Sequence, residues 1–376
     1  MPEELIDKIG PMTSKVMRTP RSLDIEITAR CNLRCRYCYF FNNPAVEYWD
    51  LPTDEWLTFF DELGALGVMG VTLAGGEPFI REDLTTLLEG LVHNRMRFSL
   101  LSNGTLIDDG MAAFIARTGR CTCVQVSVDG SCAAVHDTCR GHGAFDGAVR
   151  GIRTLSRYRV NVAVRVTIHR HNVDDLENIA HFLLEELGLP GFGTNSAGYL
   201  GTCRLNADDV MLTIAERQLA MATLLRLAEK YPDRISASAG PLAEGRAWRR
   251  MEDARAQGAL AFANRGRLTA CGCPSNKIAV RADGAIVPCN MLAHVELGRI
   301  NHDSLAEVWQ NSSALNQLRN RHAIPLTGFD FCAGCSYIPY CTGSCPGLAY
   351  AITGQVDHPS PDACLRRFLE NGGTIP

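Results

Sequence analysis

The sequence lacks the features that direct a protein to a membrane or to nucleic acid. No apolar run approaches the ~18 residues that a membrane-spanning helix requires. The first ten residues, MPEELIDKIG, are polar and lack the apolar core of a secretion signal. Lys and Arg number 37 against 41 Asp and Glu, and no basic block occurs, so nucleic-acid binding has no electrostatic support. We therefore expect a cytoplasmic protein with no membrane partner and no nucleic-acid partner.

Cysteine is the residue in excess, with 16 in 376 residues. Because the cysteines cluster at close spacings and no export signal precedes them, metal binding is favoured over disulfide bonds. Thiolate ligands select zinc and iron–sulfur clusters. Residues 28–40 read TARCNLRCRYCYF, which spaces Cys31, Cys35 and Cys38 as C-x3-C-x2-C. Zinc or a cubane cluster takes four ligands, and the flanks offer no obvious fourth, so an iron–sulfur cluster with one open iron fits better.

Strand-like and helix-like segments alternate through the first half of the chain. The expected strands are residues 22–28, 70–76, 97–104, 123–130, 161–169 and 191–198, and the expected helices lie near 53–66, 81–94, 108–118, 145–158 and 173–187. Six βα units in a row predict an α/β fold, a partial (β/α)6 barrel similar to a TIM barrel but short of its eight units. Polar residues such as Glu26, Gln125 and Arg165 share one face of their strands, which predicts a polar, occupied interior. A solvent-exposed sheet face is the alternative.

Composition divides the chain into four parts. We expect an N-terminal extension (1–20), the partial barrel (21–210), a helical bridge that contains no cysteine (211–268) and a small C-terminal domain rich in Cys, Gly and Pro (269–376). The last part looks like a loop-rich domain stapled by metal.

The motifs of the first half closely resemble those of the radical SAM (S-adenosylmethionine) superfamily. The signature of that family is C-x3-C-x-aromatic-C, which here reads Cys31, Cys35, Tyr37 and Cys38. GGEP (75–78), SNGT (102–105) and SVDG (127–130) resemble the family segments that line the SAM site at successive strand ends. The resemblance implies that SAM fills the open iron position through its amino and carboxylate groups. It also implies a set of cofactor-binding residues: Tyr37, Gly75, Gly76, Glu77, Asn103, Ser127, Asp129 and Arg165.

The chemistry of these residues is compatible with such roles. Backbone at Gly75 and Gly76 can approach a ligand closely, although a tight strand-to-helix turn also favours glycine. Arg165 inside a barrel is costly unless it pairs with an anion, and a carboxylate suits its bidentate geometry. Tyr37 either stacks near the adenine of SAM or packs in the interior.

The C-terminal cysteines resemble the SPASM extension of radical SAM enzymes, whose seven cysteines hold two auxiliary [4Fe–4S] clusters. By this resemblance the ligands are Cys271, Cys289 and Cys345 for the first auxiliary cluster, and Cys332, Cys335, Cys341 and Cys364 for the second. Cys273 is an extra cysteine, which either completes the first auxiliary cluster or leaves an iron open for substrate. The implied cofactors are thus three [4Fe–4S] clusters and SAM. A pair of zinc knuckles is the alternative for this domain.

Five cysteines remain outside both groups, and most are expected to be buried as small hydrophobic residues. Cys203 lies just past the sixth expected strand, and Cys139 follows the fourth. Some SPASM-type epimerases use a thiol as hydrogen-atom donor, so these two cysteines are candidate catalytic residues. Packing is the alternative role for both.

The resemblance implies an anaerobic oxidoreductase that matures a ribosomally made precursor peptide. A ferredoxin or flavodoxin would reduce the core cluster, SAM would be cleaved, and the 5′-deoxyadenosyl radical would abstract hydrogen from the peptide. The expected outcome is a two-electron oxidation, by C–C ring closure or a cross-link. The segments SNGTLIDDGMAAFIA and YIPYCTGSCPGLAYAITG are similar to the SynChlorMet-cassette SPASM subfamily, whose relatives include enzymes that form cyclopropane on Ile or Val side chains.

Other reactions are compatible with the same motifs. The alternatives are a peptide epimerase with a cysteine donor and an anaerobic sulfatase-type formylglycine maturase. A non-enzymatic electron carrier would need neither GGEP nor a polar barrel interior, which argues against it. About 20 residues precede the first strand, so leader recognition is expected from a separate protein or at another surface.

Overall fold

The computed structural model describes residues 16–43, 46–269 and 273–376. Within these residues the centre of the fold is a sheet in the order β10-β9-β8-β1-β2-β3-β4-β5-β6-β7. Neighbours from β8 to β7 are parallel, whereas β9 and β10 run antiparallel to their neighbours. The strands are β1 (Ser22–Thr28), β2 (Gly70–Gly75), β3 (Arg97–Ser102), β4 (Cys121–Ser127), β5 (Val162–Ile168), β6 (Phe192–Ser196), β7 (Ile235–Ala237), β8 (Lys277–Val280), β9 (Ala285–Val287) and β10 (Gly298–Arg299).

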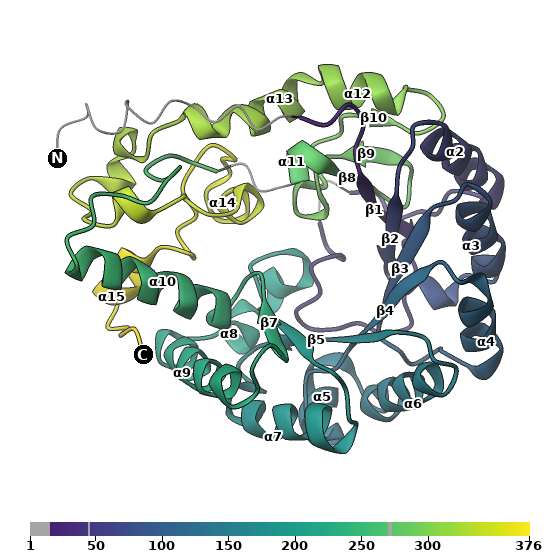
Figure 1. Cartoon of the computed structure of the whole chain (residues 1–376), viewed down its shortest axis with the longest axis horizontal. Helices are drawn as coiled ribbons and strands as arrows, with labels where there is room; N and C mark the ends of the chain where they lie inside the picture. The colour runs from purple at the N-terminus through teal and green to yellow at the C-terminus, as the bar shows by residue number, and fades with distance from the viewer. Residues whose placement is uncertain (1–15, 44–45, 270–272) are drawn as a thin grey trace.

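The strands curve into an arc with helices on its outer side, and the C-terminal part of the chain lies across the open side of the arc (Figure 1). This arrangement confirms the expected partial barrel. The helices around the barrel are α2 (Thr53–Ala65), α3 (Leu84–His93), α4 (Asp109–Thr118), α5 (Ala133–Arg140), α6 (Ala144–Arg157), α7 (Leu176–His181), α8 (Ala207–Val210), α9 (Ile214–Lys230) and α10 (Pro241–Ala256). The C-terminal helices are α11 (Cys273–Asn276), α12 (Leu305–Asn311), α13 (Ser313–Asn320), α14 (Pro346–Thr353) and α15 (Leu365–Glu370).

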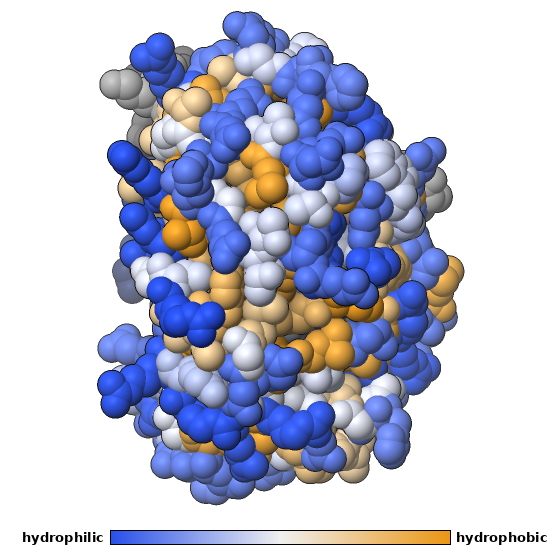
Figure 2. Space-filling view, turned by 90° about the vertical axis from the view of Figure 1, so that its right-hand side faces the viewer, coloured by the Kyte–Doolittle hydropathy of each residue, from blue (hydrophilic) through white to orange (hydrophobic). Residues whose placement is uncertain are grey.

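The main hydrophobic core lies between the outer face of the sheet and these helices. Alternation along each strand sends Leu23, Ile25 and Ile27 of β1 into this core, where they are fully buried together with Trp56 and Phe59 of α2. The outer surface of the helices is mainly hydrophilic, with small hydrophobic groups among the polar side chains (Figure 2). The helices are therefore amphipathic covers for one face of the sheet.

The inner face of the sheet is polar and yet buried. Glu26 is 4% exposed and Thr28 and His169 are fully buried, although all three lie on the side of the sheet away from the helices. A solvent-exposed sheet face would leave such residues accessible. Their burial supports the expected polar interior.

The sequence prediction missed several short elements. All six expected strands are present, and β1 has the expected bounds. The bridge expected to be helical also contains β7, a three-residue strand that extends the sheet beyond β6. Helix α5 was not expected; its eight residues lie between a strand and two glycines.

The C-terminal domain is continuous with the barrel sheet. Strand β8 pairs in parallel with β1, with Ile25 opposite Val280. The chain then turns back through β9 and β10. The first strand of the cysteine-rich domain, β8, is therefore hydrogen-bonded to β1, the strand that precedes Cys31.

Candidate active site

The three cysteines of the C-x3-C-x2-C motif lie on the segment that follows β1. Cys31, Cys35 and Cys38 are partly exposed. Burial raises the pKa of the Cys35 thiol to about 11; Arg140 opposes this shift, and the nearby Cys38 and Cys31 reinforce it. Because Cys38 and Cys31 affect the pKa of Cys35, the three sulfur atoms lie close together. Among the described residues, no three Cys, His, Asp or Glu side chains surround a point in the manner of a single bound metal ion. Three adjacent thiols at a strand end are the donor set that an iron–sulfur cluster uses.

The GGEP turn after β2 holds this cysteine segment through its backbone. Gly76 N donates to Thr28 O at 2.9 Å, and Glu77 N donates to Arg30 O at 2.8 Å. A Cβ atom on Gly76 would lie 2.1 Å from Arg30 O, and one on Gly75, at φ +117°, would lie 2.3 Å from Thr28 O. The close approach that requires glycine here is thus to the start of the cysteine segment. Contact of this turn with SAM stays a prediction.

The Glu77 carboxylate fixes the end of β3. It is 1% exposed and accepts hydrogen bonds from Ser102 Oγ at 2.8 Å and from Asn103 N at 2.7 Å. Burial raises its pKa to about 7, although these hydrogen bonds favour the ionised form. Asn103 in turn donates from Nδ2 to Asn32 Oδ1 at 2.9 Å. Glu77 therefore orients a side chain that contacts the cysteine segment.

Asp129, at the end of β4, is fully buried and has protein partners on both carboxylate oxygens. Oδ1 accepts from Thr167 N at 2.7 Å, whereas Oδ2 accepts from Arg140 Nε at 2.5 Å and from the Tyr37 hydroxyl. Burial is the largest influence and opposes ionisation, but the combined effect of Arg140, His136 and His169 leaves the pKa of Asp129 below its usual value. Tyr37 also stacks on His169 with ring centres 5.2 Å apart. Asp129 and Tyr37, both expected to contact SAM, are therefore in direct contact with each other.

Arg165 is a half-buried cation on the inner face of β5. Its Nε donates to Gln125 Oε1 and its Nη1 to Thr194 O, each at 3.3 Å, and no carboxylate among the described residues pairs with it. Burial lowers its pKa. A Cβ on Gly193 would lie 3.0 Å from Arg165 Nη1, so this glycine makes room for the guanidinium.

Two neighbours of Arg165 also face the barrel interior. Ser127 is its partner in the register of β4 and β5. Asn195 lies on the same face of β6, two residues beyond Gly193, which is opposite Arg165. Its Oδ1 is buried and has no hydrogen-bond partner among the described residues. A cation that lacks a carboxylate partner and a nearby acceptor that lacks a hydrogen-bond partner, within the described part of the chain, fit a ligand that carries both a carboxylate and an amino group.

The second group of C-terminal cysteines comes together in the structure. Burial raises the pKa of Cys332 to about 12, and its neighbours Cys341, Cys335 and Cys364 reinforce the shift. The four thiols expected for one auxiliary cluster are therefore neighbours. For the other auxiliary cluster, the segments that follow Cys289 and Cys345 pack against each other. A Cβ on Gly347 would lie 2.7 Å from the Cβ of Met291. Cys271 lies outside the described residues, so the ligand set of that cluster, including Cys273, stays a prediction.

The two candidate hydrogen-atom donors lie in the same packed cluster. Cys139 and Cys203 are 1% and 0% exposed and contact a group that includes Tyr37 and Val210. The Cys139 Sγ is 3.9 Å from His169 Nδ1. Burial raises the pKa of Cys139 to about 12 and that of Cys203 to about 11. This environment matches the packing alternative, and a catalytic role for either thiol stays a prediction.

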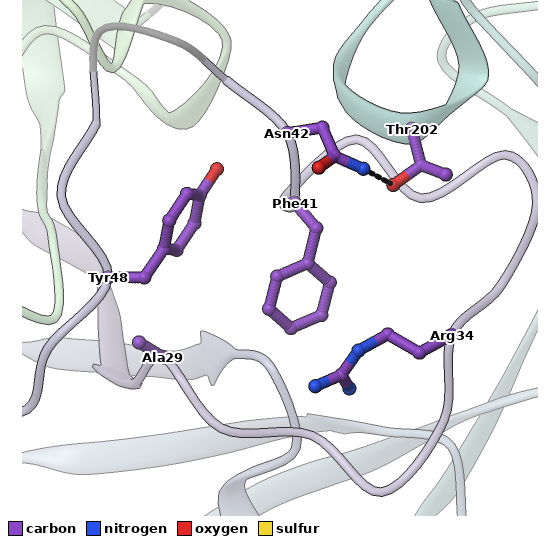
Figure 3. Close-up of a pocket in the computed structure, with 6 residues that line it drawn as sticks. All are labelled: Ala29, Arg34, Phe41, Asn42, Tyr48 and Thr202. Atoms are coloured by element: carbon purple, nitrogen blue, oxygen red, sulfur yellow. Dashed lines mark hydrogen bonds between the residues drawn. The ribbon is translucent and has the colours of Figure 1, made fainter. Parts of the chain in front are cut away.

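A cavity of about 400 Å³ borders the cysteine segment beyond the carboxyl end of β1 (Figure 3). The Arg34 guanidinium lies 4.7 Å from the centre of the Phe41 ring, and Asn42 Nδ2 donates to Thr202 Oγ1 at 3.0 Å. A second cavity of about 330 Å³ shares Ala29 and Tyr48 with it. The remaining residues that line the second cavity are Arg30, Trp49, Asp50 and Arg81.

Comparison with known proteins decides the family. The sequence matches the radical SAM superfamily over residues 25–183 and an iron–sulfur cluster-binding domain, SPASM, over residues 271–336. It is 30% identical over 356 residues to Fe-coproporphyrin III synthase of Methanosarcina barkeri, covering 91% of this chain and 87% of that protein. The chain belongs to the radical SAM superfamily. It is an enzyme whose two domains bind SAM and [4Fe–4S] clusters.

Other members of the superfamily are similar over comparable lengths. PqqA peptide cyclase of Granulibacter bethesdensis is 24% identical over 361 residues, covering 92% of this chain and 87% of that protein. The crystal structure of Streptococcus suis SuiB bound to precursor peptide SuiA matches with a TM-score of 0.70 at 15% identity, covering 93% of this chain and 77% of that chain. This structural likeness shows a common radical SAM fold. Among the described residues, no helix is both long and apolar enough to cross a membrane.

Proposed function

We propose that this radical SAM enzyme modifies a residue of a ribosomally made precursor peptide by a two-electron oxidation. The observation that carries the proposal is the pairing of β8 with β1. It pairs the first strand of the cysteine-rich domain with the strand that leads into the SAM-binding cysteines, and the auxiliary clusters of that domain would accept the electron that a substrate radical loses. Across this boundary, the side chain of Tyr39, next to Cys38, interacts with that of Asn290, next to Cys289. Two similar proteins support a peptide substrate: one is named PqqA peptide cyclase, and the other, SuiB, was solved bound to precursor peptide SuiA.

The residues of the chain have distinct parts in this proposal. When bound, SAM and the core cluster supply a carbon-centred radical able to abstract hydrogen from an unactivated C–H bond. Cys31, Cys35 and Cys38 hold the cluster. Arg165 would pair with the SAM carboxylate, and the unpartnered Asn195 Oδ1 would accept a hydrogen bond from the SAM amino group. The two cavities at the barrel opening receive the peptide beside the cysteines.

The proposed cofactor content is three [4Fe–4S] clusters, one SAM-binding and two auxiliary. Reconstituted protein should then carry about twelve iron atoms. Replacing Cys31, Cys35 and Cys38 by Ala should abolish formation of 5′-deoxyadenosine while the auxiliary iron stays. Cleavage of SAM by this triple variant would refute the core assignment, and about four irons in the unaltered protein would refute the auxiliary clusters.

The reaction type is tested by mass spectrometry of a candidate peptide co-expressed with the enzyme. Ring closure or cross-linking removes two hydrogen atoms, and cyclopropane formation on Ile or Val is the specific outcome that we propose. An unchanged mass with altered stereochemistry would indicate epimerisation instead. The electron donor is proposed to be a ferredoxin or flavodoxin.

Modification of a tetrapyrrole is the second candidate. Its support is the 30% identity to a protein named Fe-coproporphyrin III synthase. Incubating the reduced enzyme and SAM with iron-coproporphyrin separates the two proposals. A change in the porphyrin mass, with no change in peptides, would overturn the peptide assignment.

A further inference from the structure

Arg140 is a buried cation that lies against a cysteine of the SAM-binding motif. It is the last residue of α5, is 8% exposed, and directs its Nη1 at the Cys35 sulfur over a distance of 3.9 Å. Arg36, the residue next to Cys35, instead directs its guanidinium to the surface carboxylate of Asp209 at 2.8 Å. Of these two nearby cations, Arg140 is the one whose guanidinium contacts a thiol of the motif.

The position of Arg140 is held by an ion pair with Asp129 and by the Tyr37 ring. Asp129 Oδ2 accepts from its Nε at 2.5 Å, and Asp129 is itself fixed by Thr167 N at 2.7 Å. The guanidinium carbon lies 5.4 Å from the centre of the Tyr37 ring, whose hydroxyl donates to the same Asp129 oxygen. A cation clamped in this way cannot swing away from the sulfur without breaking a buried ion pair.

We propose that Arg140, positioned by Asp129, sets the reduction potential of the core cluster through its hydrogen bond to Cys35. The inference rests on the proposed function, because it takes Cys35 as a cluster ligand. Adding an electron makes the cluster more negative, and a donor or a positive charge at a ligand sulfur stabilises that reduced state. Burial strengthens the effect, because the surrounding protein screens charge less than water does. Arg140 raises the potential, and the carboxylate of Asp129 limits the increase.

The test is a redox titration of the anaerobic holoenzyme, followed by EPR spectroscopy. The core cluster is identified by the change that added SAM makes in its spectrum. Arg140→Gln should disfavour reduction at least tenfold at equilibrium, which for a one-electron couple is a decrease of about 59 mV in potential. Asp129→Asn should shift the potential in the opposite direction, because the cation then lacks its counter-charge. Arg140→Lys, which keeps the charge, should fall between Arg140→Gln and the unaltered enzyme.

Potential shifts of opposite sign in Arg140→Gln and Asp129→Asn distinguish an electrostatic role from a structural one. General damage to the site would shift the potentials of both variants in the same direction. Arg36→Gln is the matched control and should leave the potential unchanged. Unchanged potentials in both Arg140→Gln and Asp129→Asn, or shifts of the same sign, would overturn the inference and leave the proposed function intact. If Arg140→Gln fails to retain iron, the signs from Asp129→Asn and Arg140→Lys decide. Absence of any SAM-sensitive cluster in the unaltered enzyme would overturn both proposals.

Discussion

At the scale of single residues, Glu26 is a carboxyl group whose surroundings oppose its ionisation. It faces the barrel interior, is 4% exposed, and has its pKa raised from 4.5 to about 8, mainly by burial. Arg281 lies nearby and favours ionisation, but its guanidinium is already bonded to both carboxylate oxygens of Asp283. Glu26 is therefore protonated in the folded protein over a range of pH in which an unfolded chain has lost that proton.

This difference predicts a pH-dependent cost of folding. As pH rises from 4.5 to 8, the unfolded chain releases a proton that the folded protein keeps, so stability falls, and the full penalty is present above pH 8. Each unit of raised pKa corresponds to about 1.4 kcal/mol. Glu26→Gln removes the titration, so its melting temperature should exceed that of the wild type by a margin that grows across this range. Thermal unfolding of both proteins at several pH values measures it, and a constant margin would contradict the assignment.

Gly76 provides the second prediction at this scale. A methyl group on this residue would lie 2.1 Å from Arg30 O, so Gly76→Ala must displace the start of the cysteine segment. We expect loss of the core cluster, with SAM cleavage reduced by at least about tenfold, because ligand geometry depends on that backbone. Iron content and 5′-deoxyadenosine formation are the measurements.

Gly110→Ala is the matched control for this substitution. The nearest atom to its new Cβ is Asp108 Oδ1 at 3.5 Å, an ordinary contact, and the residue lies in helix α4. Iron content and 5′-deoxyadenosine formation should therefore stay at the wild-type level in Gly110→Ala. Equal iron content and equal cleavage in the two variants would show that the GGEP turn does not position the cysteines.

At the scale of elements, α9 begins with a complete capping box. Thr213 Oγ1 accepts from Glu216 N, and Glu216 Oε2 accepts from Thr213 N at 2.7 Å. Glu216 also pairs with Arg170, which follows β5, at 3.1 Å. The cap thus ties the first helix of the bridge to the barrel.

Thr213→Ala should destabilise the protein by about 1 kcal/mol, the usual effect of removing a side-chain cap. Thr213→Ser keeps the hydroxyl and should restore most of this stability. The shift in chemical unfolding midpoint measures both variants. Equal destabilisation by Ala and Ser would assign the effect to the lost methyl group rather than to the cap.

At the scale of the whole molecule, the two domains share one sheet. β1 lies between β2 and β8, and Leu23 and Ile25 are fully buried. A fragment of residues 1–268 would expose the β8 side of β1, including its unpaired backbone groups, next to the cysteine segment. We expect this fragment to aggregate even under anaerobic conditions. Size-exclusion chromatography of the fragment beside the full chain tests this, and a monodisperse fragment with a SAM-sensitive cluster would show that the barrel folds alone.

Local patterns were enough to predict most of the barrel and the metal-binding chemistry. Ligand spacing in C-x3-C-x2-C and the period-two alternation of β1 depend on residues close together in the sequence, so they are legible without a structure. The same holds for the polar inner face, which follows from the positions of Glu26 and Arg165 along their strands.

The tertiary structure alone decided which distant residues meet. It placed Arg140 on the Cys35 sulfur and β8 against β1, and it packed Cys139 together with Cys203. It also turned the glycines of GGEP toward the cysteine segment of the chain itself. The physical reason is that such contacts depend on how a short helix or strand packs against the sheet. Its position is determined by burial and by ion-pair geometry summed over the fold, and no local pattern encodes that sum.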